Sequence, residues 1–428
     1  MYKVLVISHN AMDKNTNNGR TLLELFSGFD KNNLAQLVLH PNKINPEYCS
    51  TTFQITEIDI LKNFFRKKRV GNLIENCDEE VVNHSENTAS LYRKGSKKKS
   101  SYVLCRNLIW DTKKWFNKKL KNWLKEFNPD VIFFFAGGST FSLKLTMKIS
   151  KFLNIPYVSF WTDDYYLNNE NLNGFFGLIN NHIYKKQVRK LMKKGEYISL
   201  TDLMLEKYDK VFSKQGNCIY TTSSMKSFEN KIHKLPLTMS FLGNISFDRY
   251  KSLIDIADCI CENQLPITFN LYTAEKREWI LNNVLDVKCL NYCGQVEYDK
   301  VKEIICESDI LVHVENFGKD TIKEVKYSLS TKIADSLSSN RCLLAYGPDE
   351  VASMDYLIKN NCAIIAPSKQ ELEEKLKQLV NNTEILDEKA NFALKIAECN
   401  HNPANNQAKI NQIFEQMIVN SVKCSKEK

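Results

Sequence analysis

Short apolar runs alternate with segments of helical periodicity along most of the chain. Runs such as Lys3–Ser8, Val131–Phe135 and Tyr157–Trp161 have the length and composition of buried strands. Between them, apolar residues recur every three to four positions, which is the spacing of a helix with one buried face. This alternation predicts an α/β protein in which parallel sheets carry helices on both faces.

The pattern resets near Lys231–Pro236 and then repeats. The expected strands of this second half lie near Thr238–Leu242, Ile267–Tyr272, Val287–Leu290, Ile310–Val314, Cys342–Ala345 and Ala363–Ala366. With 428 residues, the chain is long enough for two cores of about 200 residues each. We therefore expect an N-terminal domain at 1–232 and a C-terminal domain at 233–404.

A basic insertion at 62–127 departs from this rhythm. The chain has a formal charge of +9, but residues 62–125 alone hold 17 Lys or Arg and six Asp or Glu, so the remainder is slightly negative. The first part of the insertion has the composition of a long loop. Residues 107–127 have helical spacing, with Trp115, Phe116 and Trp123 on one face and lysines elsewhere.

The helix expected at 107–127 has three interpretations. It can dock on its own domain through the aromatic face, lie in an anionic membrane interface, or, as the least favoured reading, bind nucleic acid. No apolar run reaches the roughly 18 residues needed to span a bilayer. The first residues, MYKVLVISHN, lack the apolar segment of a signal peptide. We therefore expect a cytoplasmic protein, with peripheral contact to the inner face of the cell membrane left open.

Thirteen cysteines and seven histidines are scattered along the chain. Only Cys259 and Cys261 are close together, and they have no second pair at zinc-finger spacing. Reduced thiols in a reducing compartment fit this distribution. The sequence therefore predicts no metal site, and it contains none of the short motifs that mark P-loops, dinucleotide sites or zinc proteases.

The sharpest chemical cluster follows the expected strand Ile310–Val314. Glu315 comes at the carboxyl end of this strand, Lys332 falls in the first turn of a later helix, and Asp335 stands one turn further on. Lys332 and a helix N-terminus are suited to a diphosphate, and a carboxylate at Asp335 is suited to ribose hydroxyls. A surface helix with a Lys–Asp pair three residues apart is the alternative.

The run from Leu290 to Ala345, NYCGQV…DILVHVENFG…STKIADSLSSNRCLLA, resembles the C-terminal domain of GT-B glycosyltransferases, most closely glycosyltransferase family 4. The resemblance implies two doubly wound Rossmann-like domains that face each other across a cleft, and a last helix, 405–428, that returns to the first domain. Lys332 matches a family lysine, and Asp335 stands where a ribose-binding glutamate is expected. Glu315 takes the place of the first family glutamate, with TIKEVKYSL as an extra loop after it.

The same resemblance assigns roles to other strand ends. A basic pair on the donor diphosphate falls on Arg249 and Lys251. Glu315 and the acids Asp163 and Asp164, which are expected to face the acceptor, are the candidate catalytic residues. The remaining candidates for donor binding are Gly19, Gly243, Asn244 and Glu350. For Gly19, an ordinary glycine at the start of a helix is an equal alternative.

These assignments predict a hexosyltransferase-type glycosyltransferase. It would move a sugar from a nucleotide-sugar to a hydroxyl acceptor, a glycan or lipid-linked glycan, in bacterial cell-surface polysaccharide synthesis of the capsule or O-antigen type. Similarity to family 4 implies retention of configuration, no metal and no cofactor besides the donor. Anionic membrane contact through 62–127 is an expected interaction, and nucleic acid is not. A nucleotide-sugar epimerase of the same fold, or a non-catalytic membrane-associated partner subunit, are the alternatives.

Overall fold

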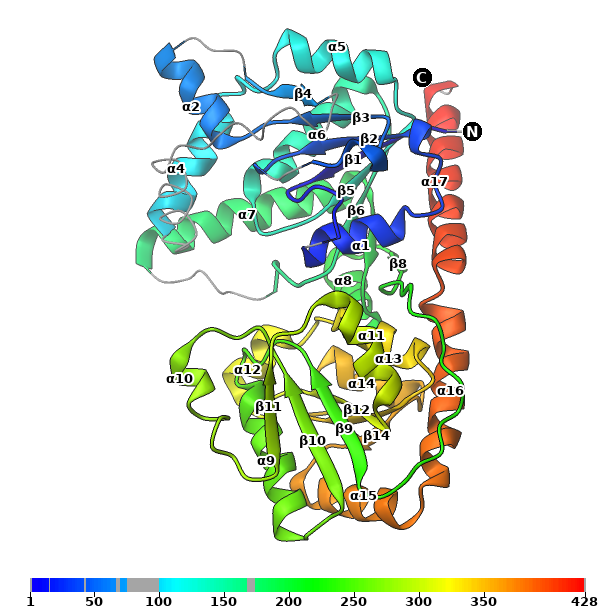
Figure 1. The fold of residues 1–428 in the computed structure, drawn as a ribbon. Helices are drawn as coiled ribbons and strands as arrows, with labels where there is room; N and C mark the ends of the chain where they lie inside the picture. The colour runs from blue at the N-terminus through cyan, green and yellow to red at the C-terminus, as the bar shows by residue number, and fades with distance from the viewer. Residues whose placement is uncertain are drawn as a thin grey trace. The chain divides into compact units, whose positions relative to one another are not determined.

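The computed structural model describes residues 2–14, 16–41, 44–66, 70–74, 100–167 and 174–426. The chain divides into two compact units, each with its own sheet (Figure 1). The first unit contains Met1–Leu200, Leu205–Ile219 and Gln407–Lys428, and the second contains Thr201–Met204 and Tyr220–Asn406. No described helix is both long enough and apolar enough to cross a membrane.

The first unit is built on an eight-stranded sheet of order β4-β3-β2-β1-β5-β6-β7-β8. Only the edge strand β4 runs antiparallel to its neighbour. The strands are β1 (Val4–Ser8), β2 (Leu34–Val38), β3 (Thr51–Gln54), β4 (Asn72–Ile74), β5 (Val131–Phe135), β6 (Tyr157–Trp161), β7 (Glu196–Ser199) and β8 (Asn217–Cys218). Every residue of β1, β2, β5 and β6 is buried, as expected for mainly apolar strands in a sheet covered on both faces.

Helices connect and cover these strands. They are α1 (Asn17–Leu25), α2 (Glu57–Arg66), α4 (Ser100–Asp111), α5 (Lys118–Phe127), α6 (Thr140–Leu153), α7 (Gly174–Lys194), α8 (Asp202–Phe212) and α17 (Pro403–Lys426), with short 3-10 turns η1 (Lys31–Asn33) and η2 (Pro46–Tyr48). The C-terminal helix α17 packs on the core of the first unit, where Phe414 contacts the rings of Tyr2 and Phe133.

The second unit has a six-stranded parallel sheet of order β11-β10-β9-β12-β13-β14. The strands are β9 (Leu237–Leu242), β10 (Ile267–Tyr272), β11 (Leu290–Gly294), β12 (Ile310–Val314), β13 (Cys342–Tyr346) and β14 (Ile364–Ala366). Its helices are α9 (Arg249–Glu262), α10 (Glu278–Leu281), α11 (Tyr298–Glu307), α12 (Lys319–Val325), α13 (Thr331–Ser338), α14 (Ala352–Lys359), α15 (Lys369–Asn381) and α16 (Glu384–Asn400).

The order of the second sheet has a single reversal point. The chain adds strands outward from β9 through β10 to β11, then returns to place β12 on the other side of β9. In doubly wound sheets, ligands bind beyond the carboxyl ends of the strands at such a reversal. In the second unit this position lies beyond Leu242 of β9 and Val314 of β12.

The helix expected at 107–127 is in fact two helices, α4 and α5. The break follows Asp111, and Lys113 there adopts a left-handed backbone conformation (φ 58°). Trp115 and Trp123 are buried and donate their indole N–H groups to Trp110 O and Thr51 Oγ1. These tryptophans therefore dock the helices on their own unit, and they are not available to a membrane interface.

Two other expectations for the second half are wrong. The strand expected at Val287–Leu290 lies at Leu290–Gly294, because Cys289 has a left-handed conformation that cannot continue a strand. The segment expected as an extra loop after Glu315 contains α12, which begins at Lys319 and ends at Val325. Thr321 and Val325, one turn apart, bury its inner face.

Candidate active site

An ion pair between Arg249 and Glu315 occupies the reversal point of the second sheet. Arg249 is the first residue of α9, directly after the β9 loop, and Glu315 directly follows β12. The guanidinium donates from Nε to Glu315 Oε2 at 3.0 Å and from Nη2 to Oε1 at 2.8 Å. A bidentate pair of this kind fixes the position of both side chains.

The protein surrounds Glu315 closely. Its carboxylate is 3% exposed, its backbone N–H donates to Tyr346 O, and its carbonyl accepts from Ser252 Oγ. A Cβ at Gly347 would lie 3.0 Å from Glu315 Cβ, so only glycine fits there without a shift. Burial raises the pKa of the Glu315 carboxyl, whereas the Arg249 guanidinium lowers it.

His313 lies beside this pair because it precedes Glu315 by two residues, and alternate residues of a strand face the same side. Its Nε2 atom is 3.7 Å from Glu315 Oε1 and has no hydrogen-bond partner among the described residues. Burial and the nearby charges of Arg249 and Lys332 lower the pKa of His313 to about 3. The imidazole is therefore neutral at pH 7.

Lys332 reaches the same position from α13. A Cβ at Gly243, in the loop after β9, would lie 3.2 Å from both Cε and Nζ of Lys332. Gly243 therefore leaves room for the lysine side chain to pass over the loop. Because Lys332 also acts on the pKa of His313, its charge and that of Arg249 belong to one cluster.

This cluster combines two cations with one buried carboxylate, so its net charge is positive. Glu315 uses the Nε and Nη2 atoms of Arg249, and a guanidinium has five N–H donors, so others remain for a second acceptor. Lys332 is an exposed residue that adds a second positive group. The arrangement is suited to an anionic group such as a diphosphate at the reversal point of the sheet.

The other residues expected at this site lie apart from the cluster or have structural partners. Lys251 is paired with Asp248 at 2.8 Å, and its side chain is 53% exposed. Asn244 Oδ1 accepts from Ser246 N at 2.7 Å and stabilises the β9 loop. These contacts make Arg249 and Lys332, and not Lys251, the principal cations of the site.

Two of the acids expected at the site, Asp335 and Glu350, contact residues outside the cluster. Asp335, one turn after Lys332 on α13, accepts a hydrogen bond from Ser223 Oγ at 2.6 Å. Glu350 is exposed in the loop after β13 and forms an ion pair with Lys326 at 3.3 Å. The structure therefore brings together Gly243, Arg249, Glu315 and Lys332, and it adds His313 and Gly347 to them.

In the first unit, Gly19 is buried in the first turns of α1. A Cβ there would lie 2.3 Å from Asp13 Oδ2 and 2.6 Å from Ala11 O. The Gly19 N–H donates to Thr16 Oγ1, which caps the helix. Close packing of the preceding loop on α1 therefore explains the glycine without a ligand.

The two acids after β6 differ in their surroundings. Asp164 Oδ1 accepts from the backbone N–H groups of Tyr166 and Leu167 and from Tyr208 Oη, at 2.8–3.0 Å. Asp163 Oδ2 accepts at longer distances, 3.2 Å from Thr162 Oγ1 and 3.4 Å from Tyr165 Oη. Asp164 thus holds the turn after β6, whereas the hydrogen bonds that Asp163 accepts from Thr162 and Tyr165 are longer.

His9, at the carboxyl end of β1, was not among the expected site residues. Burial, with smaller effects of Arg106 and His40, lowers its pKa to about 3. Its ring packs edge to face on Phe141, with the ring centroids 5.4 Å apart. Its Nε2 atom has no hydrogen-bond partner among the described residues. In the sequence, His9 could have been found by its position directly after the first strand. His313 could have been found because it precedes Glu315 by two residues and so faces the same side of β12.

The described residues include no group of three or more His, Cys, Asp or Glu that converges as metal ligands do. No family model and no curated protein matches the chain. Solved structures do. Anabaena HepE, in complex with UDP and glucose, superposes with a TM-score of 0.63 at 9% identity, covering 97% of this chain and 100% of HepE.

Two further solved structures have the same architecture. Sucrose-phosphate synthase from Thermosynechococcus elongatus has a TM-score of 0.60 at 9% identity and covers 98% of this chain and 100% of its own. WaaG, a glycosyltransferase involved in lipopolysaccharide biosynthesis, has a TM-score of 0.55 at 11% identity, with 95% and 98% covered. The chain therefore has the GT-B fold, with two Rossmann-like units, as the sequence predicted.

Proposed function

We propose that this protein is a glycosyltransferase that transfers a sugar from a nucleotide-sugar to a hydroxyl acceptor. The observation that carries the proposal is the cluster of Arg249, Lys332 and Glu315 at the reversal point of the second sheet. Its positive groups face the position at which doubly wound sheets bind ligands. HepE, which shares this fold, binds UDP and UDP-glucose, and this supports a donor of that class.

The chemistry of transfer explains the cations. When the bond between the sugar and the diphosphate breaks, negative charge develops on the leaving phosphate oxygens. Arg249 and Lys332 stabilise this charge from fixed positions, because the Glu315 carboxylate holds the guanidinium and Gly243 lies directly under the lysine side chain. Glu315 in this proposal positions Arg249, and Asp335 holds the ribose.

We assign the acceptor to the N-terminal domain, 1–232, and the nucleotide-sugar to 233–404. Asp163 is the proposed acceptor-facing acid, because its hydrogen bonds are longer than those that hold Asp164 in place. The acceptor class is a glycan or lipid-linked glycan of bacterial cell-surface polysaccharide synthesis. Retention of configuration and independence of metal belong to the same proposal.

The proposal includes contact with an anionic membrane surface, as a lipid-linked acceptor requires. The tryptophans of α4 and α5 do not support this contact, because they are buried. The basic runs at 67–69 and 97–99 lie outside the described residues. Among the described residues of the first unit, exposed side chains other than these tryptophans are therefore the candidates for this surface.

A panel of nucleotide-sugars and UDP tests the proposed function in two steps. Thermal unfolding with each compound should identify one donor that raises the melting temperature, and product analysis with that donor should find transfer or slow hydrolysis. Interconversion of the sugar without an acceptor would identify an epimerase instead. Stabilisation by no compound, or binding without transfer or hydrolysis, would contradict the proposed activity and favour a non-catalytic partner subunit.

A further inference from the structure

Helix α7 presents an outward face with an unusual composition. The residues that bury its inner side are Gly177, Asn180, Tyr184, Val188, Leu191 and Met192, at the spacing of one helical face. The helix contains six Lys or Arg and no Asp or Glu. Its outward side chains therefore carry only positive charge.

The N-terminal end of this face is apolar. Phe175 is 73% exposed, Phe176 49% and Leu178 55%, and the centroids of the two phenyl rings lie 5.9 Å apart. Adjacent exposed phenylalanines are costly in water, because their apolar surface stays hydrated. Such a tip is typical of a surface that has a partner.

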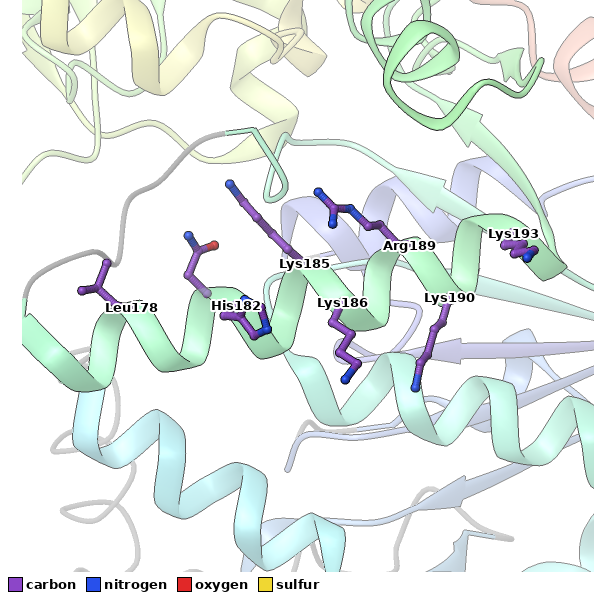
Figure 2. A pocket seen from close by; sticks show the side chains of 8 residues that line it. Leu178, His182, Lys185, Lys186, Arg189, Lys190 and Lys193 are labelled. Carbon is purple, nitrogen blue, oxygen red and sulfur yellow. The ribbon is translucent and has the colours of Figure 1, made fainter.

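The C-terminal half of the face is basic. Lys186, Arg189, Lys190 and Lys193 are exposed, and the three lysines form no ion pair among the described residues. Figure 2 shows the side chains of Lys185 and Arg189 along one edge of this face and those of Lys186 and Lys190 along the other. Arg189 also donates to Tyr166 Oη at 2.8 Å, which fixes its direction.

We infer that this α7 face (Phe175, Phe176, Leu178, Lys186, Arg189, Lys190 and Lys193) docks on an anionic lipid bilayer. At 1.5 Å per residue, the face extends for about 27 Å from Phe175 to Lys193. The phenyl rings insert at headgroup depth, and the cations contact the negative lipid headgroups. The inference rests on the membrane association proposed above, and it is independent of donor binding.

A bilayer fits this face better than a nucleic acid does. Proteins that bind single strands interleave aromatic and basic side chains along a groove, so that bases stack while phosphates are paired. On the α7 face the phenylalanines gather at one end, and the basic residues begin nearly three turns later. This separation matches an apolar tip in the acyl boundary and a cationic stem among headgroups.

Co-sedimentation of the full chain with vesicles tests the inference. The wild type should bind vesicles of phosphatidylcholine that contain 30 mol% phosphatidylglycerol. Its partition coefficient should be at least about tenfold higher than for pure phosphatidylcholine, and it should fall as the salt concentration rises. The triple variant K186E/K190E/K193E should lower the partition coefficient by at least about 100-fold, since loss of each cation costs roughly fivefold and the new carboxylates are repelled by the surface. F175S/F176S should lower it without changing the salt dependence.

The matched control is K207E/K210E/K300E, which makes the same charge change at exposed lysines of α8 and α11. Its partition coefficient should stay within about threefold of the wild-type value, because lysines far from the bilayer affect binding only weakly through the net charge. Equal loss in the control and the α7 variant, or no preference for anionic vesicles, would overturn the inference. Displacement from vesicles by a single-stranded oligonucleotide would assign the face to nucleic acid.

Donor binding, followed in the same variants by thermal unfolding with the nucleotide-sugar, separates the two proposals. Unchanged donor binding together with lost vesicle binding supports the α7 face. Vesicle binding by a protein that binds no nucleotide-sugar would leave the α7 inference standing and contradict the proposed function. Far-UV circular dichroism of each variant shows whether α7 still folds, and the single variant K190E serves if the triple variant does not.

Discussion

Arg249 and Glu315 form a bidentate ion pair that joins the start of α9 to the end of β12, 66 positions apart in the chain. The pair places one guanidinium, through its partner carboxylate, at the reversal point of a parallel sheet. The carboxylate is almost completely buried, and the guanidinium is 17% exposed. The pair is therefore both a structural element and part of the proposed diphosphate site.

Arg249→Ala should destabilise the second unit by about 3 kcal/mol at pH 7.5, because it leaves a buried carboxylate without its partner. Burial already raises the pKa of Glu315, and loss of Arg249 raises it further. A carboxyl with a raised pKa in the folded state costs stability as pH rises through that pKa, so the destabilisation should shrink toward pH 5. Urea unfolding at both pH values measures it; Lys251→Ala, at an exposed side chain, is the control. An equal loss at both pH values would show that Glu315 is not the cause.

Gly347→Ala should disturb the same pair from the other side. Its Cβ would lie 3.0 Å from Glu315 Cβ and 3.1 Å from Glu315 N, so Glu315 has to shift by a few tenths of an ångström, which disturbs its pairing with Arg249. We expect a loss of about 1–3 kcal/mol, as for overpacking elsewhere, together with weaker donor binding. Gly137→Ala is the control, since its nearest neighbour would be His9 Cδ2 at 3.9 Å. Equal stability of the Gly347 and Gly137 variants would show that close packing of Gly347 on Glu315 does not contribute to the stability of the second unit.

Much of the architecture followed from the sequence, because β1, β5, β6, β12 and β13 are short, mainly apolar runs that are too hydrophobic for surface segments. The edge strand β11 was misplaced because its residues after Leu290 are exposed or only partly buried, and because Cys289 ends the preceding loop. Helix α7 was missed, since Asn180 and Tyr184 on its buried side weaken the apolar spacing.

The candidate site was predictable only in part. Glu315 and Lys332 stood out by their positions at a strand end and a helix start. The pairing of Glu315 with Arg249 depends on how β9 and β12 come together in the sheet, which local patterns do not encode. The sequence favoured Lys251 and Arg249 equally, and the structure separates them: Arg249 pairs with the buried Glu315, whereas Lys251 is exposed and pairs with Asp248.

Lys251→Ala should therefore change donor affinity by less than about threefold, as expected for an exposed ion pair. Lys332→Ala should weaken it by about tenfold or more, since a charge-assisted hydrogen bond to the ligand is lost. Titration of each variant with the donor identified by thermal unfolding compares the two lysines directly. The reverse order of effects would move the diphosphate toward Lys251 and the loop around Asp248.

Replacement of Asp164 should lower the stability of the protein, whereas replacement of Asp163 should lower the rate of sugar transfer to the acceptor. Asp164→Ala removes an acceptor for two backbone N–H groups and Tyr208 Oη, so it should cost about 2–3 kcal/mol. Asp163→Ala should leave the thermal midpoint within about 2 °C of wild type, because the hydrogen bonds from Thr162 and Tyr165 that it breaks are long. It should nevertheless lower the rate of sugar transfer more than the rate of donor hydrolysis. If Asp163→Ala lowers stability as much as Asp164→Ala, both acids are structural.

His233 gives the second unit a pH-dependent contact. Its Nδ1 lies 2.7 Å from Asp309 and its Nε2 3.3 Å from Asp387, while Lys231 also pairs with Asp309 at 3.0 Å. The hydrogen bond to Asp309 raises the pKa of His233 above 6.5. A raised pKa means that the contribution is complete below pH 6.5 and is lost as pH rises through the folded-state value. His233→Gln should therefore destabilise more at pH 6 than at pH 9 in urea unfolding; an equal difference at both would contradict this.

The central claim is that Arg249 and Lys332 bind the diphosphate of a nucleotide-sugar. Calorimetric titration of the wild type and Lys332→Ala with UDP tests it most directly, because Lys332 is exposed and its replacement is expected to disturb the fold little. Lys300→Ala, at another exposed lysine, is the matched control. We predict one UDP per chain in the wild type and control, and an affinity at least about tenfold lower in Lys332→Ala. Equal affinity in all three proteins would contradict the claim.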